Sequence, residues 1–226
     1  MLFNTDMVRA LLSGRKTVTR RVVKPQPRAI YHDGKLYKKR GKCFVVAEDN
    51  HGGLVRIALP YQPGDILYVR ETWTKLFYVD EDGYTHYDQP MYFYAADGTP
   101  DITLRDADGF TLDDQRIRWR PSIHMPKEAA RIFLRVTDVR VERLQEITEI
   151  GARAEGTMPV MTSRVYDEPN EDKAWCAYYS ALPAFPQLWD GTIKPTDIGI
   201  YGWTANPWVW VIEFERISRE GAQRNA

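Results

Sequence analysis

Apolar residues spaced three and four positions apart near the N-terminus predict a short helix at residues 4–13. Asn4 or Thr5 can cap its first turn, because a side-chain oxygen can accept a hydrogen bond from an unpaired backbone N–H. The apolar face of this helix is formed by Val8, Leu11 and Leu12. Gly14 then supplies the residue that most readily takes the left-handed conformation at a helix end. The β-branched residues that follow predict a strand over 17–23.

Four later segments have the composition of strands, because they are rich in β-branched and aromatic residues. They are residues 66–73, 91–96, 130–141 and 208–214. The apolar positions of the third segment change phase near Thr137, which predicts a bulge or bend there. The last segment starts apolar on both faces, which predicts a buried strand.

Two helices are expected later in the chain, at residues 147–155 and 170–181. Gly156 ends the first of them, and the stretch between the two is expected to be flexible. Three long stretches are interpreted as insertions, namely residues 28–60, 74–118 and 157–205. The second of these includes an Asp- and Gly-rich segment at 97–114, which is expected to form an exposed loop.

Several strands with few helices predict an α+β fold, in which a small β-barrel carries flanking helices and long loop insertions. The chain has 226 residues, of which 43% are hydrophobic and 27% charged, and this favours one large domain over residues 1–226. No apolar run approaches the roughly 20 residues that a membrane span needs, and a secretory signal pattern is missing from the N-terminus. We therefore expect a cytoplasmic protein without a membrane partner.

The sequence contains none of the common metal or cofactor motifs. Cys43 and Cys176 are too few and too far apart for a disulfide framework or a cysteine-rich zinc site, and the four histidines are scattered. A glycine-rich phosphate loop, His-Glu-x-x-His, Cys-x-x-Cys and Gly-x-Ser-x-Gly are all missing. No metal and no other cofactor is therefore predicted.

Charge is distributed unevenly along the chain, although the net charge is zero. Residues 1–42 hold twelve Lys and Arg against only Asp6 and Asp33, so this end carries a balance of +10 and the remainder −10. Such clustering favours an anionic partner, and the alternative is a solvated basic face without one.

The densest group of candidate functional residues lies at 14–21, where six of the eight residues are Lys, Arg or Thr. Strand alternation places Thr19 and Arg21 on one face. A threonine hydroxyl becomes a nucleophile when a neighbouring base takes its proton, and a lysine can act so only if its pKa is lowered. The basic neighbours of Lys16 would lower its pKa, but its side chain reaches Thr19 only if Lys16 lies in the turn before the strand. The alternative is an exposed barrel-edge strand protected by its charges.

Two further groups combine basic and aromatic residues. In the first, Arg70 can pair with a phosphate and Trp73 can stack on a base, with Glu71 between them. The alternative for this group is an ordinary ion pair beside a core tryptophan. The second group lies in the Pro-bounded segment 119–126, which can close over a ligand or form a rigid connection. Its candidate contacts are Arg120, Ser122 and His124.

Four motifs follow one another between Leu2 and Phe214. They are Gly14-Arg15-Lys16-Thr17-Val18-Thr19-Arg20, Pro63-Gly64-Asp65-Ile66-Leu67, Ala154-Glu155-Gly156 and Asn206-Pro207-Trp208-Val209-Trp210-Val211-Ile212-Glu213-Phe214. In content and order they resemble the activating-signal-cointegrator homology (ASCH) domain, a PUA-like β-barrel. The chain is also similar to the longer ASCH proteins of tailed phages and prophages.

The resemblance implies that a nucleoside or nucleic acid binds in a cleft of the barrel. Small bacterial members of the family remove the acetyl group from N4-acetylcytidine, and their catalytic residues match Lys16, Thr19 and Glu155. In that scheme Thr19 attacks the amide carbonyl, Lys16 takes its proton and Glu155 assists the leaving nitrogen. The expected substrate contacts are Arg15, Arg20 and Arg21, together with the two further groups.

Other ASCH proteins are RNA-binding modules or ribonucleases, and the insertions make this chain roughly twice the size of the compact hydrolases. Three functions therefore stay open. They are hydrolysis of N4-acetylcytidine or a related modified nucleoside, non-catalytic binding of RNA or DNA, and RNA cleavage. In each case the expected partner is a nucleoside, RNA or DNA.

Overall fold

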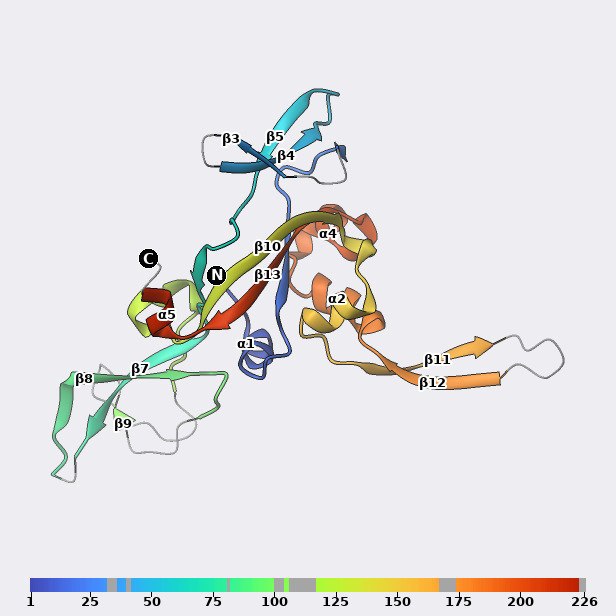
Figure 1. Ribbon diagram of the computed structural model, residues 1–226. Helices are drawn as coiled ribbons and strands as arrows, with labels where there is room; N and C mark the ends of the chain where they lie inside the picture. The colour runs from blue at the N-terminus through green and yellow to red at the C-terminus, as the bar shows by residue number, and fades with distance from the viewer. Residues whose placement is uncertain are drawn as a thin grey trace. The chain divides into compact units, whose positions relative to one another are not determined.

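The computed structural model has an α+β architecture made mostly of strands, which confirms the predicted fold class (Figure 1). It describes residues 1–31, 36–39, 42–80, 82–99, 104–105, 117–166 and 174–223. A curled half-barrel sheet has the strand order β1-β13-β10-β6, and this arrangement is compatible with a small barrel. The bounds of its strands are Val18–Val22 for β1, Trp208–Ile217 for β13, Phe133–Arg143 for β10 and Ile66–Tyr68 for β6.

The chain groups into two compact units, each assembled from segments that are distant in sequence. The first unit consists of Met1–Ser13, Ile66–Leu134 and Arg216–Ala226. The second consists of Gly14–Asp65 and Arg135–Glu215. Because β10 and β13 each have residues in both units, the grouping does not test the predicted single domain, which stays a prediction.

The N-terminal helix of the first unit, α1 (Thr5–Leu12), confirms the helix predicted there. The Asn4 side chain accepts a hydrogen bond from the Met7 backbone N–H at 2.9 Å, so the predicted cap is present. After this helix, Gly14 has a φ of 74°, which is the left-handed conformation expected at a helix end.

The first unit also holds a three-stranded sheet with the order β8-β7-β9. Its bounds are Trp73–Val79 for β7, Thr85–Tyr94 for β8 and Leu104–Arg105 for β9. The predicted strand at 66–73 is wrong in extent, because it is divided between β6 and β7. Between these strands the Val69 N–H donates to the Ile132 carbonyl at 2.9 Å and the Arg70 N–H donates to the Met1 carbonyl at 2.7 Å. The predicted strand at 91–96 is confirmed as the end of β8.

Short helices complete the first unit. They are η2 (Ser122–His124), η3 (Lys127–Ala129) and α5 (Arg219–Gln223). Around them a buried apolar cluster is formed by Trp73, Met125, Ala129, Ala130, Phe133 and Ala222. The loop predicted at 97–114 lies mostly outside the described residues.

In the second unit, β1 runs antiparallel to β13 in a regular register. The strands predicted at 17–23 and 208–214 are therefore confirmed. The first half of β13 is buried on both faces, as predicted, because Val209, Trp210, Val211 and Ile212 are all buried. Pairing with β13 therefore fixes the positions of the candidate residues of β1.

The strand predicted at 130–141 is confirmed as β10, which begins at Phe133. Its buried positions change phase as predicted, since Val136 and Val139 are buried while Thr137 between them is exposed. Beyond this change the strand carries valines on one face and charged residues on the other.

The helix α2 (Glu149–Ala154) confirms most of the helix predicted at 147–155. The Thr148 hydroxyl caps it by accepting from the Gly151 N–H at 3.1 Å, and Gly156 ends it with a φ of 86°. The other helical segments of this unit are η4 (Leu144–Glu146), η5 (Leu182–Ala184), α3 (Phe185–Asp190), η6 (Pro195–Asp197), α4 (Ile198–Tyr201) and η7 (Trp203–Ala205). Within the described ranges, no helix is both long and apolar enough to cross a bilayer.

Two of the predicted insertions form β-structure of their own in the second unit. Residues 28–60 contain β2 (Ala29–Ile30), β3 (Tyr37–Lys39), β4 (Lys42–Glu48) and β5 (Leu54–Ala58), in which β4 pairs with the other three. Residues 157–205 contain the antiparallel ribbon of β11 (Val160–Tyr166) and β12 (Ala174–Ser180) (Figure 1).

The ribbon overturns two predictions. The helix predicted at 170–181 is wrong, because its described part is β12, and the stretch predicted to be flexible before it contains β11. Alanines in this segment favour a helix, whereas Tyr178 and Tyr179 favour a strand. Pairing with β11 supplies the backbone hydrogen bonds that decide between them.

Candidate functional site

The candidate lysine and glutamate meet at the start of β1. Lys16, two residues before the strand, forms an isolated antiparallel bridge with Glu155, which directly follows α2. The neighbouring Thr17 N–H donates to the Ala154 carbonyl at 2.9 Å. These backbone bonds fix two segments that lie 139 positions apart in the sequence.

The Lys16 ammonium is fully buried and donates to three acceptors. Its Nζ lies 2.6 Å from Glu155 Oε2, 2.9 Å from the Glu155 carbonyl and 2.8 Å from the Val18 carbonyl. The side chain of Lys16 is 0% exposed and that of Glu155 is 5% exposed. An ammonium has three N–H donors, so this environment matches its hydrogen-bonding capacity.

Burial controls the protonation of this lysine. Loss of solvation lowers the pKa of Lys16, and the positive charges of Arg21 and Arg20 lower it further, while contact with Glu155 raises it. The net result is a pKa below the ordinary value for lysine. A titratable group shifted by burial and a specific charge partner is typical of functional sites.

Arg20 holds the second oxygen of the same carboxylate. Its guanidinium donates to Glu155 Oε1 at 3.2 Å and to Glu142 Oε2 at 3.4 Å, and its side chain is 3% exposed. Glu155 is therefore shared by two buried cations, and Glu142 supplies the compensating negative charge. Removing one member would leave a buried charge without its partner, which is strongly unfavourable.

Thr19 lies on the other face of the strand. The register pairs Thr19 with Ile212 and Arg21 with Trp210, whereas Arg20 pairs with Val211. Because side chains alternate along a strand, Thr19 and Arg21 share one face, as predicted from the sequence, and Arg20 belongs to the opposite face. Thr19 is 3% exposed.

The ammonium of Lys16 lies at the edge of β1. The Thr17 carbonyl accepts from the Phe214 N–H, and the Val23 N–H donates to the Trp208 carbonyl, so odd-numbered residues of this segment bond to β13, although the Thr17 N–H turns to Ala154. The Val18 carbonyl, to which Lys16 donates, therefore points to the open edge. Lys16 thus precedes the regular part of the strand, as the sequence required, and contacts Glu155. No described contact joins it to the Thr19 hydroxyl.

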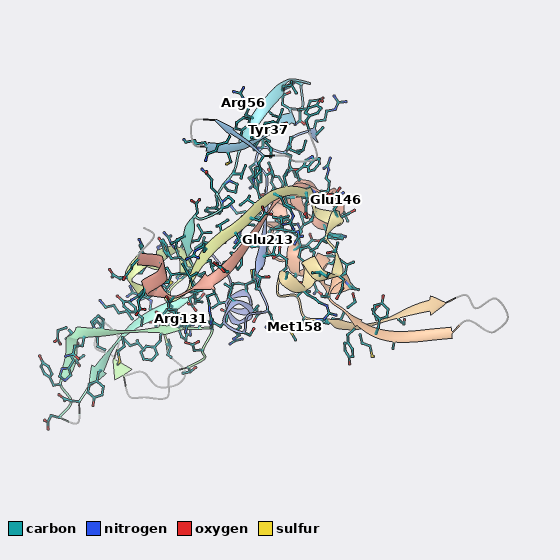
Figure 2. The ribbon with its side chains drawn as sticks, viewed as in Figure 1. Tyr37, Arg56, Arg131, Glu146, Met158 and Glu213 are labelled. Carbon is teal, nitrogen blue, oxygen red and sulfur yellow. The ribbon has the colours of Figure 1, made fainter. Side chains whose placement is uncertain are left out.

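A charged pocket opens on the Arg20 face. Its volume is about 200 Å³. The charged residues that line it come from β1, β10, β13 and η4, and Figure 2 labels two of them; they are Arg20, Arg140, Glu142, Glu146 and Glu213. The Arg140 Nε donates to Glu142 at 2.5 Å, and its Nη1 pairs with Glu213. Thr19 is not among the described lining residues, so the pocket and the candidate nucleophile occupy different faces.

Arg15, the remaining basic residue before β1, is exposed. Its Nη1 donates to the Gly156 carbonyl at 3.3 Å and contacts the Met158 sulfur at 2.8 Å. It therefore borders the segment after Glu155 without contacting the carboxylate in any described interaction.

The predicted contacts at 70–73 belong to the first unit. Glu71 is 1% exposed, and its two oxygens accept from Arg131 at 3.0 and 2.9 Å. Trp73 is 4% exposed and belongs to the apolar cluster. Arg70 donates to the Tyr68 hydroxyl at 2.7 Å and to the Ile123 carbonyl at 3.2 Å. Glu71 thus forms an ion pair and Trp73 lies in the core, which is the alternative that the sequence left open for this group.

The predicted contacts at 119–126 also lie in the first unit. Arg120 and His124 line a pocket of about 330 Å³ with Arg118, Trp119 and Pro121. Ser122, which begins η2, is partly buried and is not among the described residues that line this pocket.

Sequence reasoning did not single out Glu142, although it completes the charge cluster around Arg20. A signal for it was present in β10. Charged residues alternate there with buried valines, in the order Asp138, Val139, Arg140, Val141 and Glu142. Such alternation predicts a strand with one charged face, but the partner of that face depends on the sheet order.

Within the described ranges, no three His, Cys, Asp or Glu side chains are grouped so that they could hold a metal ion. No family model matches the chain, and neither a characterised protein nor a solved structure matches it.

Proposed function

We propose that this chain is an ASCH-domain protein of the PUA-like class that hydrolyses an acylated nucleoside, with N4-acetylcytidine as the expected substrate. The observation that carries the proposal is the buried 2.6 Å contact that Lys16, which lies three residues before Thr19, makes with Glu155. The resemblance of four motifs supports the family, and the curled half-barrel sheet supports a barrel-like fold.

The first step of the proposed reaction is a proton exchange within the buried pair. Lys16 passes one ammonium proton to the Glu155 carboxylate along their hydrogen bond, which leaves a neutral amine and a neutral acid. Burial of Lys16 favours this exchange, because it disfavours the charged ammonium. The lowered pKa of Lys16 has the same origin.

In the second step the neutral amine acts as a general base. Lys16 takes the proton of the Thr19 hydroxyl as the Thr19 oxygen attacks the amide carbonyl carbon. Lys16 precedes the regular part of β1, so its side chain is not confined to one face of the strand, and in this step its amine turns from Glu155 to the Thr19 hydroxyl. Arg21 shares the face of Thr19 and provides a positive charge for the carbonyl oxygen that becomes negative.

The third step releases the nucleoside. The carbon–nitrogen bond breaks, and Glu155 returns its proton to the departing N4 nitrogen, so that Lys16 is again an ammonium and Glu155 a carboxylate. Water then attacks the acyl ester of Thr19. The bond between the acyl carbon and the Thr19 oxygen breaks, a proton from the water restores the Thr19 hydroxyl, and the free carboxylic acid leaves. Arg20 holds Glu155 throughout, since its 3.2 Å contact uses the carboxylate oxygen that Lys16 does not contact.

The proposal is tested by incubating the purified chain with N4-acetylcytidine and measuring cytidine by chromatography. The Thr19→Val variant keeps the shape of the side chain and removes the hydroxyl, so we expect turnover to fall by at least about 10³-fold. Thr19→Ser retains a hydroxyl and is expected to retain measurable turnover. Thr74→Val is the matched control, because Thr74 is also buried in a strand, at 4% exposure, outside the site.

Turnover by the wild-type chain that does not exceed a protein-free blank would refute the substrate assignment. Equal turnover by wild type and Thr19→Val would refute the nucleophile. Release of shortened RNA from a labelled strand, abolished by Thr19→Val, would instead assign the site to RNA cleavage.

A further inference from the structure

A second pocket lies in the first unit, among residues that the proposed hydrolysis does not use. It has a volume of about 330 Å³, within the range of pockets that hold small ligands. The described residues that line it come from one short segment of the chain and are Arg118, Trp119, Arg120, Pro121 and His124.

The segment that forms this pocket is basic throughout. Residues 117–127 contain two arginines, a lysine and a histidine, and no aspartate or glutamate. Arg118 and Arg120 are both exposed. Within the described ranges neither guanidinium has a carboxylate partner, in contrast to Arg131 of the same unit, which is paired with Glu71 and Asp97. A guanidinium carries N–H donors and no acceptor, so both side chains suit an anionic ligand.

The pocket is held in place by the backbone. Arg120 and Trp73 exchange two hydrogen bonds, of 2.7 and 3.2 Å, which fix the start of the segment against β7. The Arg120 guanidinium lies 5.5 Å from the centre of the Trp73 ring, within the range of a cation–π contact. Further along, the His124 N–H donates to the Pro121 carbonyl at 3.1 Å and closes the η2 turn. A preformed pocket loses less conformational entropy when a ligand binds.

Trp119 gives the pocket an apolar surface beside its charges. Its side chain is partly exposed and lies between the two arginines in the sequence. A planar guanidinium can donate two parallel hydrogen bonds to a phosphate, and an indole face can stack on a nucleobase. Inorganic anions and acidic peptides would use the arginines and leave the indole face unused.

We propose that this pocket binds a nucleotide, with the phosphate at Arg118 and Arg120 and the base stacked on Trp119. The ligand is a free mononucleotide or one nucleotide of a single strand, and these share the chemistry that the pocket recognises. The inference does not rest on the proposed hydrolysis, because it concerns other residues and requires no turnover.

The test measures binding in two arms. Quenching of tryptophan fluorescence follows cytidine monophosphate, and fluorescence anisotropy follows a labelled single-stranded oligouridylate. We expect Arg118→Ala and Arg120→Ala each to weaken binding about tenfold, and Trp119→Ala to weaken it roughly 10- to 100-fold. Arg9→Ala is the control, since it removes an exposed charge from the same unit away from the pocket and should change affinity less than about twofold.

The salt dependence provides a second measurement. If Arg118 contacts a phosphate of the oligonucleotide, Arg118→Ala should reduce the slope of log affinity against log salt by about one. Arg120→Lys keeps the charge and loses the planar fork, so it should bind more weakly than wild type and more tightly than Arg120→Ala.

The two arms identify the source of the nucleotide. Comparable affinity for both ligands assigns a mononucleotide site, and much tighter binding of the oligonucleotide assigns a single-strand site. Either result supports the proposal if the pocket variants weaken binding and Arg9→Ala does not. Absence of binding in both arms, or full binding by the Arg118→Ala/Arg120→Ala double variant with native circular dichroism, would overturn it.

Discussion

Among the residues that the structure describes, two glutamates are almost completely buried, one in each unit, and their cation partners differ. Glu71 is 1% exposed and accepts two hydrogen bonds from one guanidinium, that of Arg131. Glu155 is 5% exposed and is shared between the ammonium of Lys16 and the guanidinium of Arg20. The two carboxylates are similarly buried, so the two sites differ in whether the cation that contacts the carboxylate can give up a proton.

Arg131 cannot act as a base. Burial works to lower the pKa of Arg131, but hydrogen bonds to Glu71 and Asp97 outweigh this and raise the pKa above its ordinary value. For Lys16 the balance is reversed, since burial lowers its pKa more than Glu155 raises it. A buried carboxylate paired with arginine is therefore a fixed clamp, whereas one paired with lysine can exchange a proton.

The largest expected effect comes from replacing the proton-exchanging partner. Lys16→Met keeps the length of the side chain and removes the base, so we expect turnover of N4-acetylcytidine to fall by about 10²- to 10⁴-fold. Arg20 still holds Glu155 in this variant, which should help the chain to fold. Turnover is measured by chromatography on protein whose circular dichroism matches that of wild type.

Lys24→Met is the matched control for this substitution. Lys24 is exposed and contacts the ring of Tyr201, so its loss removes the same charge without touching the buried pair. If Lys24→Met and Lys16→Met reduce turnover equally, the effect arises from net charge and the role of Lys16 as a base is wrong.

The next largest effect is expected from breaking the ion pair between Glu71 and Arg131 in the first unit. Glu71→Gln leaves the Arg131 guanidinium without its main partner, and we expect the free energy of unfolding to fall by about 3–5 kcal/mol. Asp97→Asn, which alters the other carboxylate on the same arginine, should cost less than about 1 kcal/mol, because the Asp97 side chain is 52% exposed. Urea denaturation measures both, and equal losses would show that burial does not distinguish the two pairs.

The difference between local and long-range contacts explains which elements the sequence could predict. Local signals were sufficient for α1, for the left-handed Gly14 and for the strands around Val209, because caps, glycines and apolar periodicity act over a few residues. The ribbon was missed, because the alanines of β12 favour a helix until β11 pairs with them. Strand formation there depends on a partner, and propensity is measured without one.

The candidate site was predictable only in part, because some of its contacts are local and others join distant segments. Alternation alone placed Thr19 and Arg21 on one face, while the contact between Lys16 and Glu155 was expected only through a family resemblance. The role of Arg20 as a clamp on Glu155 could not be predicted, since it depends on where α2 ends in space. Long-range contacts of this kind are set by the fold and leave no spacing in the sequence.

A smaller effect is expected from the titration of Lys16. Its pKa is lower in the folded chain than the ordinary 10.5 of an unfolded chain, so between these values the unfolded state binds more protons. The contribution of Lys16 to stability therefore increases as the pH rises through that window. Urea denaturation between about pH 7 and about pH 10 should show wild type gaining stability relative to Lys16→Met.

Turnover should follow the same direction, since a rising pH converts the ammonium to the amine. Lys16→Arg cannot lose its proton in this range, and it is expected to remove the pH-dependent rise along with most of the activity. A rise in turnover that survives in Lys16→Arg would assign the titration to another group.

The smallest effect concerns a third glutamate, Glu149, which is partly exposed and is held mainly by neutral donors. Glu149 in α2 accepts from the Ser180 hydroxyl at 2.6 Å and from the Leu182 N–H at 3.0 Å, so it ties the end of β12 to this helix. The hydrogen bond from Ser180 is the main reason that the pKa of Glu149 is lowered to about 2. A lowered carboxyl pKa stabilises the fold above the ordinary value of 4.5, and this contribution is lost as the pH falls through about 2.

Glu149→Gln should therefore lower the melting temperature by only about 2 °C at neutral pH, because the side chain is 37% exposed and solvent screens its charge. The difference between variant and wild type should shrink as the pH approaches 2. A difference that stays constant across this range would mean that Glu149 contributes through packing, since only its charge titrates. Unlike Glu71 and Glu155, this carboxylate needs no buried cation, which is why its removal should have the least effect of the three.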